Sequence, residues 1–114
     1  MIAVIFELQP NEGRTGDYFD LAAALRSQLD AIDGFISIER FQSLGDPGRY
    51  LSLSFWENEA AVTQWRNTAE HRAAQAAGRA GILAHYRLRI AEVTRDYGLS
   101  ERAEAPADSR ARHG

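Results

Sequence analysis

The stretch FWENEAAVTQWRNTAEHRAAQAAGR, residues 55–79, decides how this chain folds. It starts as the end of a strand and continues into helix-forming sequence rich in alanine. Asn58 can cap a short helix over residues 59–66. Asn67 is a second cap candidate, and Glu70 follows it at the spacing of a capping box. We therefore predict two helical pieces with a break near Asn67, and not one long helix.

The predicted break decides where two rare side chains point. Trp65 and His71 lie six residues apart, so on one continuous helix they would face different directions. A break near Asn67 would turn both side chains toward one cavity. Each residue also has a purely structural interpretation, Trp65 as part of the core and His71 as a surface or half-buried hydrogen-bonding group. The sequence leaves both interpretations open.

The elements around this stretch alternate in an order that predicts the fold class. Apolar and alternating sequence predicts strands, and apolar residues at helical spacing predict one further helix. The sequence GDPG at 45–48 predicts a hairpin turn. In chain order we predict a strand at 2–9, a helix at 18–32 capped by Asp17, strands at 35–44 and 49–57, the two helical pieces, and a strand at 85–95. This is the order of a ferredoxin-like βαββαβ domain, an α+β fold with a four-stranded antiparallel sheet and its helices on one face.

The face of the sheet that no helix covers predicts a partner. Leu51, Leu53 and Phe55 alternate with a set that contains serines and Trp56, so neither face of this strand is fully polar. A bare face would expose an apolar patch, and pairing of two sheets into a dimeric α+β barrel would cover it. We expect the mixed set that carries serines, arginines and Trp56 to wall a cavity. Alternation alone does not say which face meets the partner.

Length and composition bound the remaining possibilities. The 114 residues suit one domain, and Lys+Arg 13 against Asp+Glu 16 gives a net charge of −3, so we expect no nucleic-acid partner. The chain has no cysteine, which excludes disulfides and thiolate ligands, and we predict no metal site. No apolar run approaches the roughly 18 residues of a membrane helix, so we expect a cytoplasmic protein with no membrane partner. We expect residues 1–98 to form the domain and the polar residues 99–114 to form a tail, flexible or packed on the partner subunit.

Charged residues on the last predicted strand form a second candidate group. His85 and Arg87 alternate onto one face of that strand. Arg87 on an internal face would need a carboxylate or a ligand anion as its partner. Glu39, expected on a neighbouring strand, would supply the carboxylate. A structural ion pair and a binding role for Arg87 are equally open.

Three phrases give the chain a family resemblance. GFISIERFQS, YLSLSFWENEAAVTQW and EHRAAQAAGR resemble the second strand, the third strand and the following helix of the antibiotic biosynthesis monooxygenase (ABM) family of dimeric α+β barrels. The resemblance covers about residues 1–97. It implies a homodimer and one of two activities, the cofactor-independent oxygenation of phenolic compounds or the degradation of haem.

The phenol-oxygenase activity implied by the resemblance needs neither a metal nor a flavin. It implies that Trp65 walls the cavity and that a neutral His71 takes the phenolic proton. Arg87, or less directly His85, would stabilise the developing negative charge. The expected catalytic residues are Trp65, His71 and Arg87, and the expected substrate-binding residues are Phe6, Trp56, Gln75 and His85. The expected substrate is a small aromatic molecule held between sheet and helices, with no cofactor.

The haem-degrading activity implied by the same resemblance fits this sequence less well. It resembles a constellation of asparagine, tryptophan and histidine, of which Trp65 matches the tryptophan. Gln75 stands where the haem-ligand histidine would fall, and Phe6 and Glu7 stand near the asparagine position. Haem is therefore disfavoured as a cofactor. Two alternatives to the oxygenase stay open, a non-catalytic or regulatory ligand-binding barrel and a haem binder that uses His71.

Overall fold

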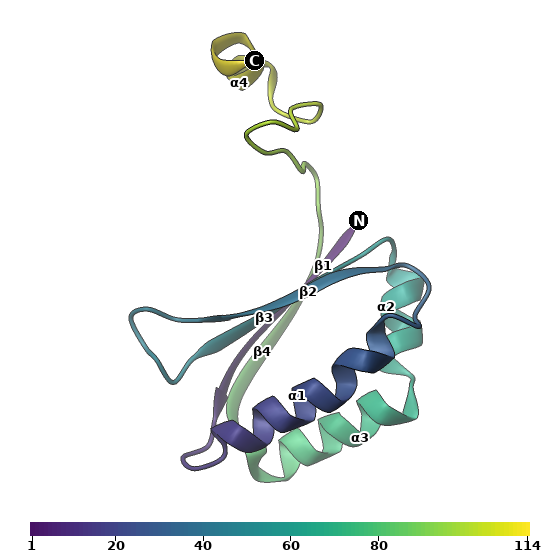
Figure 1. Ribbon diagram of the computed structural model, residues 1–114, viewed down its shortest axis with the longest axis vertical. Helices are drawn as coiled ribbons and strands as arrows, with labels where there is room; N and C mark the ends of the chain where they lie inside the picture. The colour runs from purple at the N-terminus through teal and green to yellow at the C-terminus, as the bar shows by residue number, and fades with distance from the viewer.

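The computed structural model describes residues 1–114, except the side chains of residues 69 and 70, and has the predicted βαββαβ order (Figure 1). The elements are β1 (Ile2–Pro10), α1 (Thr15–Leu29), β2 (Phe35–Gln42), β3 (Tyr50–Trp56), α2 (Glu59–Arg66), α3 (Ala69–Ala77), the π-type turn η1 (Gly78–Ile82), β4 (Leu83–Glu92) and α4 (Ala107–His113). The predicted helix break is confirmed, because α2 and α3 are separate helices. The sequence indicated neither η1 nor α4.

The four strands form one antiparallel sheet in the order β2-β3-β1-β4. β1 lies between β3 and β4, with Ile2 opposite Trp56 on one side and Glu92 on the other. α1, α2 and α3 lie on one face of this sheet, and none of the described helices covers the other face (Figure 1). The ferredoxin-like fold class predicted from the sequence is confirmed.

Two apolar clusters fill the space between the sheet and the helices. The first consists of Ile2, Leu29, Trp56, Ala61 and Val62. The second consists of Leu8, Tyr18, Ala22 and Ile82. Trp56 is only 2% exposed, and its Nε1 donates a hydrogen bond of 2.9 Å to Ser54 Oγ, so the buried indole keeps a polar partner. α1 contributes its C-terminal end to the first cluster and its N-terminal half to the second.

The strand register assigns side chains to the two faces of the sheet. On β1, Phe6 packs beneath the helices and Glu7 alternates onto the open face. On β3, the serines and Trp56 face the helices, and the open face carries the aliphatic set Leu51, Leu53 and Phe55. On β4, Arg87 lies opposite Glu7 and so shares the open face. The prediction that serines, arginines and Trp56 wall one cavity is therefore wrong, because the β4 arginines lie on the other side of the sheet.

The helix starts show which cap predictions hold. The side chain of Asn58 accepts a hydrogen bond of 3.0 Å from a backbone amide of α2, which confirms it as a cap. Thr68, and not Asn67, caps α3, because Asn67 closes the preceding helix. The side chain of Glu70, the other half of the expected capping box, lies outside the described side chains. The expectation that Asp17 caps the first helix is wrong, since it lies within the first turn of α1, where a negative charge suits the helix dipole.

Beyond β4 the chain forms an arm, residues 94–114, that carries α4 away from the sheet (Figure 1). Arg102 organises the arm by donating to the carbonyls of Gly98 and Gly114 at 3.2 and 2.7 Å. Its guanidinium also lies 5.3 Å from the centroid of the Tyr97 ring. Arg102 thus links three separate parts of the arm. Among the described residues, no helix combines the length and apolar character needed to cross a membrane.

Gly34 makes the tightest backbone approach between α2 and the connection from α1 to β2. Its φ of 91° is left-handed, and a Cβ added there would lie 2.8 Å from the Cβ of Ala61. We predict that Gly34→Ala lowers the free energy of unfolding by about 2–4 kcal/mol, measured by urea denaturation, through backbone strain and overpacking. Gly45→Ala is the control, because a Cβ there meets nothing within 4 Å. An equal loss in both variants would contradict the prediction.

Candidate functional site

Trp65 and His71 meet at the break between α2 and α3. Their ring centroids lie 5.1 Å apart, with an interplanar angle of 55°. Thr68 fixes this corner, because its hydroxyl donates to the Trp65 carbonyl at 2.9 Å and accepts from the His71 amide at 3.2 Å. The structure thus brings together the two residues that the sequence paired only on condition of a helix break. We call this arrangement the Trp65–His71 corner.

The environment of His71 favours its neutral form. The ring is half-buried, and its Nδ1 is enclosed without a hydrogen-bond partner among the groups that the structure describes. Burial lowers the pKa of His71 below the ordinary value of 6.5. The backbone of Arg66 raises the pKa in part, and the positive charges of Arg66 and Arg72 lower it further. The imidazole is therefore neutral at neutral pH, the state in which a ring nitrogen accepts a proton.

Trp65 continues the aromatic packing of the first cluster toward the surface. Its ring centroid lies 6.5 Å from that of Trp56, which in turn lies 5.2 Å from that of Phe35. Trp56 is enclosed within the cluster, so the structure places it behind Trp65 as part of the core. Trp65 is only half-buried and keeps surface that a ligand can touch.

An apolar strip on the helix-facing side of β4 is exposed. It consists of Tyr86, Leu88 and Ile90, which are 48%, 47% and 44% exposed, and we call it the β4 strip. The Phe6 ring stacks on Tyr86, with centroids 5.7 Å apart and an interplanar angle of 9°. Val4 lies opposite Ile90 and packs against the first cluster, as Trp65 does. The Ile90 end of the strip is therefore the end nearest the Trp65–His71 corner.

Arg79 lies at the Tyr86 end of the strip. Its Nη2 donates to the Tyr86 hydroxyl at 3.3 Å. Gln75, predicted to bind substrate, is exposed on α3, four residues from His71 and four from Arg79. Residues four apart lie on the same side of a helix. Gln75 thus lies between the corner and Arg79.

Arg87 and His85 lie on the open face of the sheet, away from the corner. The register of β4 places Arg87 opposite Glu7 and His85 opposite Gln9 on β1. The side chains of β4 that face the helices are instead those of the β4 strip. The structure does not bring Arg87 or His85 together with Trp65 and His71.

Glu7 supplies the carboxylate on the open face. Its Oε2 lies 3.3 Å from Arg89 Nη1 and 3.9 Å from Arg49 Nη2. The prediction that Glu39 lies on a strand beside Arg87 is wrong, because β2 and β4 are at opposite edges of the sheet. The alternation of residues along a strand predicted which face of the sheet each side chain lies on, but not which strands are neighbours in the sheet.

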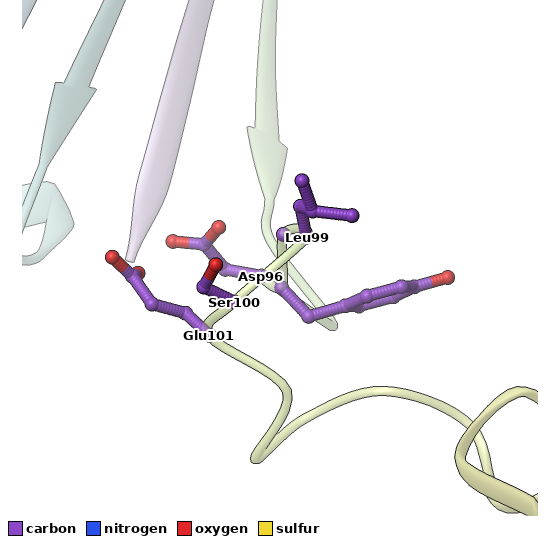
Figure 2. A pocket seen from close by; sticks show the side chains of 6 residues that line it. Asp96, Leu99, Ser100 and Glu101 are labelled. Atoms are coloured by element: carbon purple, nitrogen blue, oxygen red, sulfur yellow. The ribbon is translucent and has the colours of Figure 1, made fainter. Parts of the chain in front are cut away.

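Two hollows lie elsewhere on the surface. One, of about 330 Å³, is formed by a single run of the arm, residues 96–101, and Figure 2 shows Asp96, Ser100 and Glu101 around it. The other, of about 280 Å³, lies at the β2–β3 hairpin next to Glu7 and Arg49. Neither hollow is lined by Trp65 or His71.

Comparison with known proteins assigns the family. The profile of the antibiotic biosynthesis monooxygenase (ABM) family matches residues 1–77, and the chain belongs to this family. Jasmonate monooxygenase ABM of Pyricularia oryzae is 48% identical over 94 residues, which cover 82% of this chain and 44% of that protein. Protein YqjZ of Bacillus subtilis is 33% identical over 93 residues, 82% of this chain and 79% of that protein. The chain thus spans less than half of the fungal relative.

Solved structures show the same fold. The structure of Rv0793 from Mycobacterium tuberculosis superimposes with a TM-score of 0.76 over 85% of this chain and 98% of that one. The sequences are 15% identical, so the likeness concerns the fold alone. The resemblance read from the sequence is confirmed at the level of family and fold.

Sequence reasoning missed two parts of this region. Thr68 was overlooked because Asn67 and Glu70 gave a stronger cap signal beside it. Arg79 and Tyr86 were not associated, because they belong to a turn and a strand and meet only through the fold. The seven-residue separation of Arg72 and Arg79 on helix-forming sequence suggests one exposed stripe, whereas η1 turns Arg79 toward β4.

The lowered pKa of His71 predicts a pH dependence of stability. The folded pKa lies below the unfolded value of 6.5, so below pH 6.5 the unfolded chain binds more protons at this residue than the folded one. We predict that the free energy of unfolding falls as pH drops from 7 through 6.5 and below, and that His71→Gln removes this part of the fall. Urea denaturation across pH 5–8 measures it. His113→Gln is the control, and an unchanged profile in His71→Gln would contradict the assignment.

Proposed function

We propose that this protein is a cofactor-independent monooxygenase that oxidises a small phenolic molecule at the Trp65–His71 corner. The observation that carries the proposal is the contact at the helix break between the Trp65 ring and the half-buried His71 imidazole, which burial keeps neutral. Membership of the ABM family supports oxygenation as the class of reaction.

The proposed chemistry takes all its electrons from the substrate. Neutral His71 accepts the acidic proton of an anthrone-like phenol, which leaves a carbanion at a ring methylene carbon. This carbon forms a C–O bond with dioxygen, and His71 returns its proton to the resulting peroxide. Loss of the remaining C–H proton and of hydroxide breaks the O–O bond, so that one ring methylene and one dioxygen give one ring carbonyl and one water. The carbon loses four electrons and dioxygen gains four.

Trp65 would act as the wall against which the aromatic substrate lies. Its indole is backed by Trp56 and the first cluster, which hold it in place from behind. A flat, rigid ring offers stacking contact with an aromatic ligand and keeps water from one side of the reacting carbon. Phe6, whose ring forms part of the same side of the sheet, extends the apolar surface toward Tyr86.

The fungal relative adds a second substrate to test. Jasmonate monooxygenase ABM shares 48% identity with this chain over 94 residues. Jasmonate carries a ketone, which makes the neighbouring C–H groups acidic, and a base such as His71 can remove a proton from such a position. Oxygen uptake with jasmonate, beside the anthrone-like phenol, compares the two substrate classes directly.

Two other functions would use the same fold. A non-catalytic ligand-binding barrel would bind the phenol without consuming oxygen. A haem binder would coordinate the metal through His71 and show a shifted Soret band when the protein is mixed with haem. Oxygen uptake and the Soret band therefore separate the three possibilities in two measurements.

The first test of the proposal is oxygen uptake with an anthrone-like phenol. We expect His71→Ala to reduce turnover by roughly 10²–10⁴-fold, the usual contribution of a general base. Trp65→Phe is expected to reduce turnover less, because an aromatic wall is kept. His113→Ala, which changes a histidine of α4, is the matched control and should keep full turnover. Full turnover in both site variants would show that the corner is not the catalytic site.

We also propose that two copies pair through their open sheet faces. The aliphatic set of β3, Leu51, Leu53 and Phe55, lies on this face, and no described helix covers it. Contact between two such faces would remove apolar surface from water, at about 25 cal/mol per Å². On this proposal Arg87 and His85 lie at the subunit interface, and the polar tail, residues 99–114, packs on the partner subunit.

Sedimentation velocity tests the dimer. We expect the wild-type protein to sediment as a dimer at micromolar concentration, and Leu53→Asp to sediment as a monomer, because the new charge would have to be buried without a partner. Thr63→Asp on the exposed side of α2 is the control and should remain dimeric. A wild-type monomer at micromolar concentration would contradict the proposal.

A further inference from the structure

We propose that Arg79 binds the carboxylate of an apolar acid, whose body lies along the β4 strip and whose reacting end lies at the Trp65–His71 corner. The proposal deepens the proposed function by naming the substrate class, and it rests on that function for the position of the reacting end. Arg79 and the β4 strip belong neither to the expected catalytic set nor to the proposed dimer interface.

The β4 strip is exposed apolar surface on the helix-facing side of the sheet. Tyr86, Leu88 and Ile90 point to the side of the sheet on which the helices lie, yet each is close to half exposed. Exposed apolar groups in a row mark a binding surface more often than isolated ones do. The Phe6 ring, stacked on Tyr86, widens the strip onto β1.

Arg79 and Tyr86 together form a donor pair at one end of that strip. Arg79 donates one of its N–H groups to the Tyr86 hydroxyl, and its other N–H groups are available to a ligand. Because the hydroxyl accepts in this bond, its own proton is available for donation to a ligand. Among the described side chains, no carboxylate forms a salt bridge with Arg79. A planar guanidinium matches a carboxylate through two parallel hydrogen bonds. An acid with an apolar body would bind the donor pair through its carboxylate and pack its apolar part on the β4 strip.

The spacing of the elements sets the length of this acid. Arg79 follows His71 by eight residues, which corresponds to roughly 12 Å along a helix. The strip from Tyr86 to Ile90 covers four residue steps, or roughly 13 Å along a strand. The two estimates agree, because the helical piece and the strand connect the same two ends of the site. The carboxylate and the reacting group of the substrate should therefore be about 12 Å apart.

Binding of para-hydroxyphenyl alkanoic acids of rising chain length tests the inference. Each acid carries a phenol for the corner and a carboxylate for Arg79, and its methyl ester removes only the charge. Calorimetric titration of the wild-type protein should show the acid that spans both ends of the site bound about tenfold tighter than its ester, the scale of one charged hydrogen bond. Affinity should be greatest for the acid that separates phenol and carboxylate by about 12 Å.

Variants assign the preference to the named residues. Arg79→Gln should bind acid and ester equally, whereas Arg72→Gln, one heptad earlier on α3, should keep the tenfold preference. Tyr86→Phe should reduce the preference in part, because Arg79 loses the hydroxyl that positions it. Leu88→Asp should weaken binding of acid and ester alike. Thermal unfolding followed by circular dichroism confirms that each variant is folded.

Three results would overturn the inference. The first is equal binding of acid and ester by the wild-type protein, or no binding of either. The second is an unchanged preference in Arg79→Gln. The third is loss of an oligomer in Leu88→Asp with unchanged binding, which would assign the strip to a second copy of the chain. Titration measures binding without turnover, so it separates the two proposals. A preference for acids without oxygen uptake would reject the proposed reaction and support carboxylate binding by Arg79. Oxygen uptake without the preference would support the reaction and reject carboxylate binding by Arg79.

Discussion

One hydroxyl group, that of Thr68, holds the two halves of the candidate site in register. It accepts a hydrogen bond from the amide of His71, the third residue of α3, and donates one to the carbonyl of Trp65 near the end of α2. An uninterrupted helix turns about 100° per residue, so six residues would place the indole and the imidazole about 120° apart around it. The contact between the rings, and with it the burial that keeps His71 neutral, depends on this one interruption.

The sequence predicted the fold because its local signals agree with each other. Alternation in the strands, the GDPG turn and the Asn58 cap each point to the same βαββαβ order. What it could not predict was strand order in space, since alternation says which residues share a side and not which strand lies beside which. Arg87 was therefore given Glu39 as a partner, whereas β1 places Glu7 opposite it.

The sequence predicted the part of the candidate site that depends on local signals, and not the part that depends on contacts between distant segments. Trp65 and His71 are close in the chain, so a local signal, the cap near residue 67, was enough to bring them together. Arg79 and Tyr86 meet because η1 reverses the chain, with Gly81 at a φ of 135° that other residues rarely adopt. Nothing in the sequence marks that reversal as a π-type turn, so the contact between Arg79 and Tyr86 became visible only in the structure.

The division of the core into two clusters has an evolutionary consequence. Trp65 packs against the cluster around Trp56, whereas Ala77 and Leu83, on either side of η1, pack against the cluster around Leu8 and Tyr18. Substitutions in separate, non-touching groups of residues change stability nearly independently. Substitutions at the η1 end of the domain can therefore accumulate without displacing Trp65, so the two ends of the helix-covered side of the sheet can change independently during evolution.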